Sequence, residues 1–122
     1  KDGEINRLWQ RILTMQADVY PQGQNALAVF EQGMTPVLVR QFANLLVEQE
    51  KGETVLVCSG DDASGYNYTA GSLGRDMRAF GKELNARLQG RGGGSTQMVQ
   101  GTFRASREEI EKVFQELARI EA

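Results

Sequence analysis

A near-continuous apolar run at residues 54–59, TVLVCS, constrains the fold of this chain more than any other feature. A strand that is apolar at consecutive positions is typical of a strand buried on both faces of a sheet. Other elements must then cover both faces. The flanking segments have helical patterns, so we expect a sheet with helices packed against it.

Three further strands are expected. Residues 25–31 and 66–71 have strand-like composition or alternation, and residues 98–103 form a last short apolar segment. The turn 60–65 between two of the strands contains Asp61 and Asp62. We interpret these carboxylates as turn caps, because two of them with nearby Glu53 would hold Mg²⁺ only loosely.

Helix signals lie between the strands. Thr35 before Pro36 predicts a helix start, and Ser106 with Glu109 predicts a capping box for the final helix. Another helix is expected at about 73–89. The fold class is therefore α/β, a small mixed sheet of about four strands packed with helices and preceded by an N-terminal helix. The final helix is expected to bury Ile110, Val113, Phe114, Leu117 and Ile120.

The first 20 residues form a helical segment with one apolar stripe. Two explanations stay open: the stripe packs on the chain's own domain, or it is the seam of a homodimer. It spans only about two heptads, which is too short to indicate a coiled coil. The stripe consists of Ile5, Leu8, Ile12, Met15 and Val19, and Trp9 and Leu13 widen it.

The composition excludes several kinds of chemistry. The chain has no histidine among its 122 residues, which makes zinc hydrolysis and Ser/His/Asp or Cys/His catalysis improbable. Its single cysteine, Cys58, lies in the apolar run and is expected to be an inert buried thiol. No apolar run is long enough for a membrane span. We expect a cytoplasmic module with no catalytic residue, no metal site and no cofactor.

Positive charge is concentrated in one segment. Residues 75–107 contain seven basic and two acidic side chains, although the whole chain carries a net charge of −2. On a helical wheel Arg75, Arg78 and Lys82 fall on one side of the helix expected there, opposite its apolar side. Such a face can be ordinary solvated surface, or it can bind an anion.

A glycine-rich stretch follows this helix, and it favours anion binding. Gly92, Gly93 and Gly94 lack Cβ atoms, so their main-chain N–H groups could approach a phosphate closely. Arg91 would add charge and Ser95 a hydroxyl, with Arg104 nearby. A flexible connection is the alternative explanation. The stretch is not a P-loop, because Gly-Lys-Ser/Thr is missing.

Two tyrosines precede the basic segment. Tyr66 and Tyr68 could stack on unpaired bases if their strand faced the basic surface. Packing of at least one of them in the core is the alternative, and we favour it.

The stretch LQGRGGGSTQMVQG, residues 88–101, resembles the glycine-rich motif of the DHH-associated domain of the first type. That domain ends alanyl-tRNA synthetases, some alanyl-tRNA editing proteins and DHH phosphoesterases. The phosphoesterase branch has histidine where this chain has Ser95, so the resemblance favours the tRNA-linked branch. It implies a helical lead-in at residues 1–20 and a nucleic-acid-binding domain at residues 21–122.

The resemblance also implies a function. We expect a module that binds tRNA or another single-stranded or structured nucleic acid, and that supports deacylation of mischarged alanine-specific tRNA by a separate domain. A dimerisation module and a nucleotide-binding or oligonucleotide-binding domain of a phosphoesterase are the alternatives. The binding residues would be Arg75, Arg78, Lys82, Arg91, Gly92, Gly93, Gly94, Ser95 and Arg104.

Overall fold

The computed structural model describes the backbone of residues 2–119 and the side chains of residues 7–119. Ile5 and Ile120, predicted above as apolar contacts, lie outside the described side chains. The elements are α1 (Asp2–Ala17), β1 (Gln24–Glu31), α2 (Pro36–Glu48), β2 (Gly52–Asp61), β3 (Gly65–Ser72), α3 (Met77–Arg87), β4 (Arg91–Gly94), β5 (Met98–Phe103) and α4 (Arg107–Arg119).

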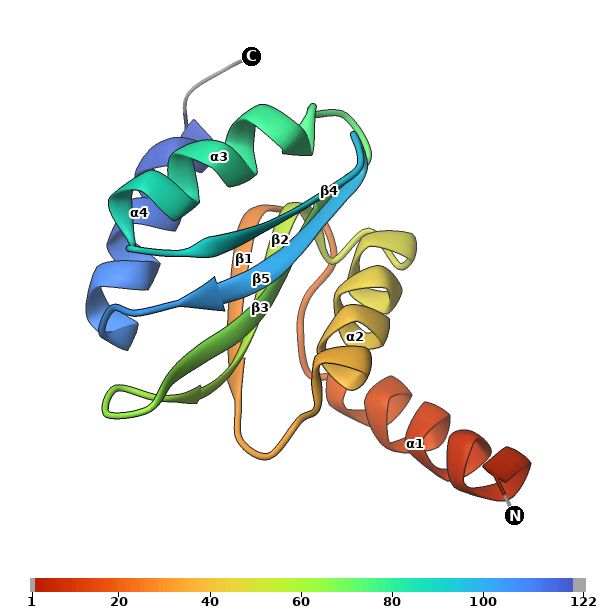
Figure 1. The fold of residues 1–122 in the computed structure, drawn as a ribbon. Coiled ribbons are helices and arrows are strands. Elements are labelled where there is room, and N and C mark those ends of the chain that lie inside the picture. Colours follow the sequence, from red (N-terminus) through yellow and green to blue (C-terminus); the bar gives the residue numbers. More distant parts are fainter. Residues whose placement is uncertain (1, 120–122) are drawn as a thin grey trace.

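The strands form one mixed sheet in the order β1-β2-β3-β5-β4. β1 and β2 are parallel, and the other neighbouring strands are antiparallel. The sheet is covered on one face by α2 and on the other by α3 and α4 (Figure 1). The predicted α/β class with a mixed sheet is therefore confirmed.

β2 is buried on both faces, as its apolar run predicts. Val55 and Val57 belong to the core beneath α2, whereas Leu56 and Cys58 belong to the core beneath α3 and α4. All four side chains are fully buried. Side chains of a strand alternate between its two faces, so a central strand with a helix layer on each side must be apolar at every position.

The sheet has five strands rather than about four. The additional strand is β4, which consists of Arg91 and the three glycines that we expected in a loop. Glycine disfavours strands, and no apolar alternation marks the segment, so local pattern could not reveal it. The strand forms through pairing with β5, in the register Arg91↔Thr102 to Gly94↔Val99.

α1 docks by one edge of the predicted stripe, through Leu13, and not by the row of Leu8, Met15 and Val19. Leu13 and Ala17 are buried in the core beneath α2. The predicted stripe instead leaves Leu8, Met15 and Val19 exposed by 58%, 70% and 74%. α1 extends away from the sheet, and its end contacts the body near the start of α2 (Figure 1). Docking through the stripe is therefore wrong for these three residues.

α3 begins later than residue 73. Asp76 is its N-cap and accepts a hydrogen bond from the main-chain N–H of Arg78. Leu73 is 71% exposed and lies in a connection that is held by main-chain bonds from Ser72 to Gln97 and from Met77 to Thr96. No described helix is both long enough and apolar enough to cross a lipid bilayer.

Candidate functional site

A groove runs between α3 and the edge strand β4, and it joins the two features that the sequence predicts to bind an anion. Its volume is about 340 Å³. α3 supplies one wall and β4 the other. The groove is lined by Arg78, Gly81, Lys82, Asn85, Gly92, Gly93, Gly94 and Val99.

Gly81 and Asn85 position α3 against the sheet. A Cβ atom at Gly81 would lie 2.8 Å from Cγ2 of Val99, so glycine lets the helix approach β5 closely. Asn85 Oδ1 accepts a hydrogen bond of 2.8 Å from the hydroxyl of Tyr68, and its Nδ2 donates to the carbonyl of Gly92 at 3.5 Å. Burial raises the pKa of Tyr68 to about 12, which keeps this hydroxyl protonated as a donor.

The edge position of β4 leaves main-chain groups of the glycines directed into the groove. β4 pairs with β5 on one side only. The carbonyl of Gly92 points to Asn85, away from β5. The N–H and carbonyl of one antiparallel strand residue point to the same side, so the N–H of Gly92 also faces the groove. Such donors can bind an anion.

The three glycines are required for different reasons. A Cβ atom at Gly92 would collide with the carbonyl of Gln100, and one at Gly94 with the carbonyl of Met98. These two glycines therefore allow β4 to pair closely with β5. A Cβ atom at Gly93 would meet nothing within 4 Å, and its backbone is outside the left-handed region. Neither packing nor backbone conformation accounts for glycine at position 93.

Two of the predicted cations, Lys82 and Arg78, line the groove, and two more lie on the strand pair that borders it. Arg78 is near the start of α3 and is paired with Asp76 at 3.0 Å, and its hydrogen bonds hold the pKa of Asp76 below the ordinary value. Exposed Arg91 begins β4, and exposed Arg104 follows β5 at the same end of this strand pair. The main-chain N–H of Arg104 donates to Leu88, which brings the end of α3 to the same place.

Arg75 and Ser95 have structural partners outside the groove. The guanidinium of Arg75 donates to the carbonyls of Leu117 and Ala118 at 2.9 and 2.8 Å, and lies 5.1 Å from the ring centre of Phe80. It thus satisfies carbonyls in the last turn of α4. Ser95 Oγ accepts from the N–H groups of Gln97 and Met98, both at 3.3 Å, in the turn between β4 and β5.

The tyrosines are unavailable for base stacking. Tyr68 is 1% exposed and stacks on Phe103 at 3.9 Å between ring centres. Tyr66 is 7% exposed, and its hydroxyl donates to Asp62. The favoured core packing is therefore confirmed for both.

The remaining candidates for chemistry have structural roles. Cys58 is fully buried, and burial raises the pKa of its thiol, as expected of an inert group. Asp61 caps the turn by accepting from the N–H of Ser64. Asp62 accepts from the N–H of Arg107, so it caps α4 rather than only the turn. Among the described residues no group of three potential ligands is placed to hold a metal ion.

Sequence reasoning missed Gly81 and Asn85. A glycine inside a helix costs about 1 kcal/mol relative to alanine, so Gly81 was a signal of close packing. Asn85 follows Lys82 by one turn on the polar side of α3, but its bond to Gly92 depends on β4 being a strand. No local pattern contains that information.

Comparison with solved structures shows which known fold this chain has. Neither protein-family models nor curated proteins match this sequence. Among solved structures, the C-Ala domain of alanyl-tRNA synthetase from Aquifex aeolicus superimposes with a TM-score of 0.68 and 21% identity. The match covers 80% of this chain and 93% of that domain. The chain has the C-Ala fold. The fold implied by the resemblance of residues 88–101 is thereby confirmed.

The C-Ala fold also occurs within larger proteins. RecJ from Thermus thermophilus, solved with Mg²⁺, matches 98% of this chain with a TM-score of 0.67 and 17% identity. An exonuclease RecJ bound to manganese matches the same share with a TM-score of 0.68 and 15% identity. The chain spans only 20% and 30% of these two proteins, so the likeness concerns one of their parts.

Proposed function

We propose that this chain binds the sugar-phosphate backbone of a nucleic acid in the groove between α3 and β4. The observation that carries the proposal is the groove itself, in which Arg78 and Lys82 of α3 line one wall and the main chain of the three glycines of β4 lines the other. The N–H of Gly92 and the ammonium of Lys82 would bind one phosphate. Arg78, Arg91 and Arg104 would neutralise neighbouring phosphates along the same path.

tRNA is the nucleic acid that we propose. The Aquifex neighbour is a domain of an alanyl-tRNA synthetase, which supports this choice. We further propose that the module acts in the cytoplasm and assists deacylation of mischarged alanine-specific tRNA by a separate domain, without catalysing it. The chain has no histidine to serve as a general base near neutral pH.

The dependence of tRNA binding on salt tests the groove. With about four phosphate contacts on unpaired or bent RNA, the slope of log K against log salt should be roughly −3, at about −0.7 per contact. Lys82→Gln should make the slope less negative by about 0.7. The matched control is Arg40→Gln, which removes an exposed cation from α2 on the opposite face of the sheet. Fluorescence anisotropy over a salt series measures both, and a slope near zero for the unaltered chain rejects the proposal.

A second candidate function is self-association through α1. The observation that favours it is the exposed apolar row formed by Leu8 and Met15 on α1, which extends from the body, and by Val19 in the turn after it. Burial of such side chains in a helix pair would remove apolar surface from water. A homodimer built in this way would leave the groove free, because α1 contacts α2 on the opposite side of the sheet.

A further inference from the structure

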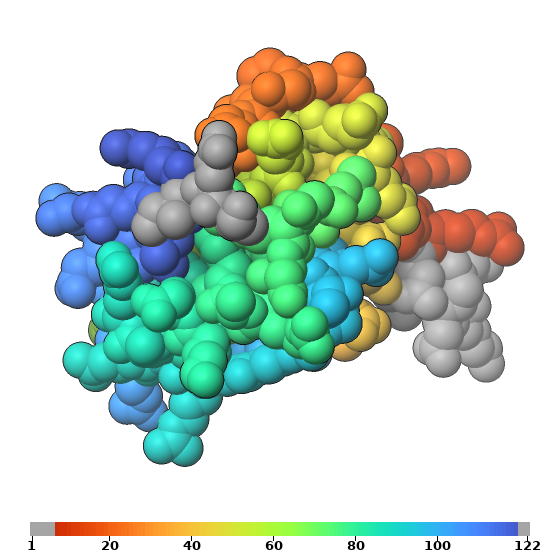
Figure 2. All heavy atoms as spheres, turned by 90° about the horizontal axis from the view of Figure 1, so that it is seen from above, coloured from red at the N-terminus to blue at the C-terminus, as the bar shows by residue number. Residues whose placement is uncertain are grey.

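A second and larger hollow lies at one end of the sheet, beside the start of α3. Its volume is about 740 Å³. β1 and β2 begin there, β3 ends there, and α2 and α4 reach it with their C-terminal ends. Seen from above, orange atoms of the β1 region and green atoms of the segment after β3 lie on the same face of the molecule (Figure 2).

Two buried hydroxyls line this hollow. Thr54 and Ser72 are paired across β2 and β3, and are only 3% and 4% exposed. The hydroxyl of Thr54 lines the hollow. Ser72 Oγ accepts from the N–H of Gly74 at 3.3 Å, which leaves its own proton available. Both hydroxyls can therefore contribute hydrogen bonds to a ligand in the hollow.

Charges around the hollow balance each other. Glu50 and Glu53 supply two carboxylates, and Arg75 and Arg119 supply two guanidinium groups. Arg75 already donates to two carbonyls of α4, so it is not free to pair with an anion. This environment does not select an ion of either sign. It suits a neutral ligand that both donates and accepts hydrogen bonds.

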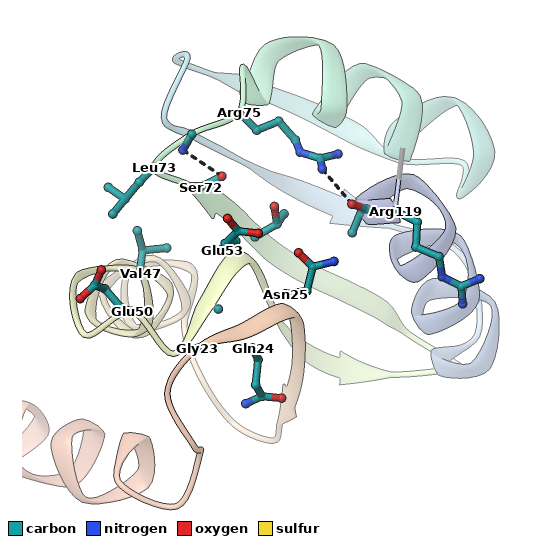
Figure 3. A pocket seen from close by; sticks show the side chains of 14 residues that line it. Gly23, Gln24, Asn25, Val47, Glu50, Glu53, Ser72, Leu73, Arg75 and Arg119 are labelled. Atoms are coloured by element: carbon teal, nitrogen blue, oxygen red, sulfur yellow. Dashed lines mark hydrogen bonds between the residues drawn. The ribbon is translucent and has the colours of Figure 1, made fainter. Parts of the chain in front are cut away.

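The groups at the centre match the hydroxyls of a sugar. Asn25 and Glu53 come from the adjoining starts of β1 and β2 and face the side of Arg75 across the hollow, whereas Arg119 points outward (Figure 3). A carboxylate accepts from sugar hydroxyls, and an amide both donates and accepts. A carboxylate is also the group that binds ribose hydroxyls in dinucleotide-binding folds.

We propose that this hollow holds a ribose of the bound strand and reads its 2′-hydroxyl, so that the module selects RNA over DNA. The inference rests on the proposed function, since the groove must hold the strand. The connection between the two sites is short: Arg75 lines the hollow and Arg78 lines the groove. Glu53 accepts from the 2′-hydroxyl, and Thr54 donates to or accepts from the same sugar. The 2′-hydroxyl is the group that distinguishes RNA from DNA.

The test compares a single-stranded RNA of mixed sequence with the DNA strand of the same sequence, using the full chain. The unaltered chain is expected to bind RNA more tightly. Glu53→Gln and Thr54→Val should each weaken RNA binding about fivefold, the effect of one hydrogen bond, and leave DNA binding unchanged. Glu108→Gln, which removes an exposed carboxylate from the far end of α4, is the matched control and should change neither.

The outcomes separate the inference from the proposed function. Equal affinity of the unaltered chain for RNA and DNA overturns the inference but leaves nucleic-acid binding in place. The inference is also overturned, with nucleic-acid binding left in place, if Glu53→Gln and Thr54→Val both keep the ratio of RNA affinity to DNA affinity of the unaltered chain. Failure to bind either strand overturns both proposals. Glu53 is exposed, so Glu53→Gln keeps the test valid even if Thr54→Val unfolds the chain.

Discussion

At the scale of single residues, three consecutive glycines in β4 differ in what a methyl group would meet. Gly92 and Gly94 are confined by carbonyl oxygens of β5, whereas Gly93 borders open space. A run of identical residues therefore contains two positions that the sheet requires and one that it does not. Position 93 can be altered to test binding separately from folding.

Gly93→Ala should leave the fold intact and should weaken tRNA binding where the bound strand lies against the main chain of β4. The methyl group meets no atom of the protein within 4 Å, so a loss of affinity would come from the ligand. Replacing glycine where the backbone tolerates alanine raises the free energy of unfolding by about 0.4–1 kcal/mol. Thermal unfolding and anisotropy measure the two effects. Unchanged affinity would argue against close approach of the ligand to β4.

Gly92→Ala is the contrasting variant. Its methyl group would collide with the carbonyl of Gln100, so β4 must move away from β5. We expect the free energy of unfolding to fall by more than about 1 kcal/mol. Equal changes in the free energy of unfolding for Gly92→Ala and Gly93→Ala would contradict the distinction between the two positions.

The sequence could predict that the groove is basic and rich in glycine, but it predicted less well which residues line it. Arg78 and Lys82 share a face because both lie within α3, where helical periodicity holds. Arg75 precedes the helix, so the helical wheel did not apply to it, and it turns to α4 instead. The contacts of Ser95 depend on a turn that forms only because β4 is a strand. These assignments needed long-range pairing, which no local pattern encodes.

At the scale of elements, the start of α4 combines a local cap with a distant one. One half of the predicted capping box is present, because Ser106 Oγ accepts from the N–H of Glu109 at 3.2 Å, while the Glu109 carboxylate accepts from the Ser106 hydroxyl instead of its main-chain N–H. Asp62, from the turn after β2, accepts from the N–H of Arg107 at 2.9 Å. It also accepts from the hydroxyl of Tyr66 at 2.6 Å. The sequence could predict the first cap because its residues are neighbours, but the second connects residues far apart in the chain.

Asp62→Asn should lower the free energy of unfolding at neutral pH. It should also make this free energy change less as the pH falls into the acid range. Hydrogen bonds from Tyr66 and Arg107 hold the pKa of Asp62 below its ordinary value of 3.8. The stabilisation is therefore present above that value and is lost as the pH falls through the lower pKa of the folded state. Thermal unfolding across this range measures it. Asp18→Asn, at an exposed site after α1, is the control, and identical acid profiles for the two variants would refute the role of Asp62.

At the scale of the whole molecule, the sequence could predict the layers of helices and sheet, but it could not predict which side of α1 faces solvent. The doubly buried run of β2 requires a helix layer on each face, and that arrangement is present. The apolar stripe of α1 has the same periodicity whether it packs inward or outward. Leu13 and Ala17 bring α1 onto the body, and Leu8, Met15 and Val19 therefore remain exposed.

Self-association through this stripe predicts a molecular mass that rises with concentration. Met15→Asp should keep the chain monomeric, because a carboxylate would have to enter the apolar contact. Thr14→Asp changes an exposed neighbour outside the stripe and should not alter association. Sedimentation equilibrium over a range of concentrations distinguishes them. A monomer at every concentration of the unaltered chain excludes dimerisation.

The burial of Cys58 also makes the chain convenient for labelling. Its thiol lies within β2 beneath α3 and α4, and the folded protein should react with maleimides only when the sheet opens. A cysteine substituted for exposed Arg91 would then take a fluorophore selectively at the mouth of the groove. The rate at which the native thiol of Cys58 later reacts would report how often the fold opens.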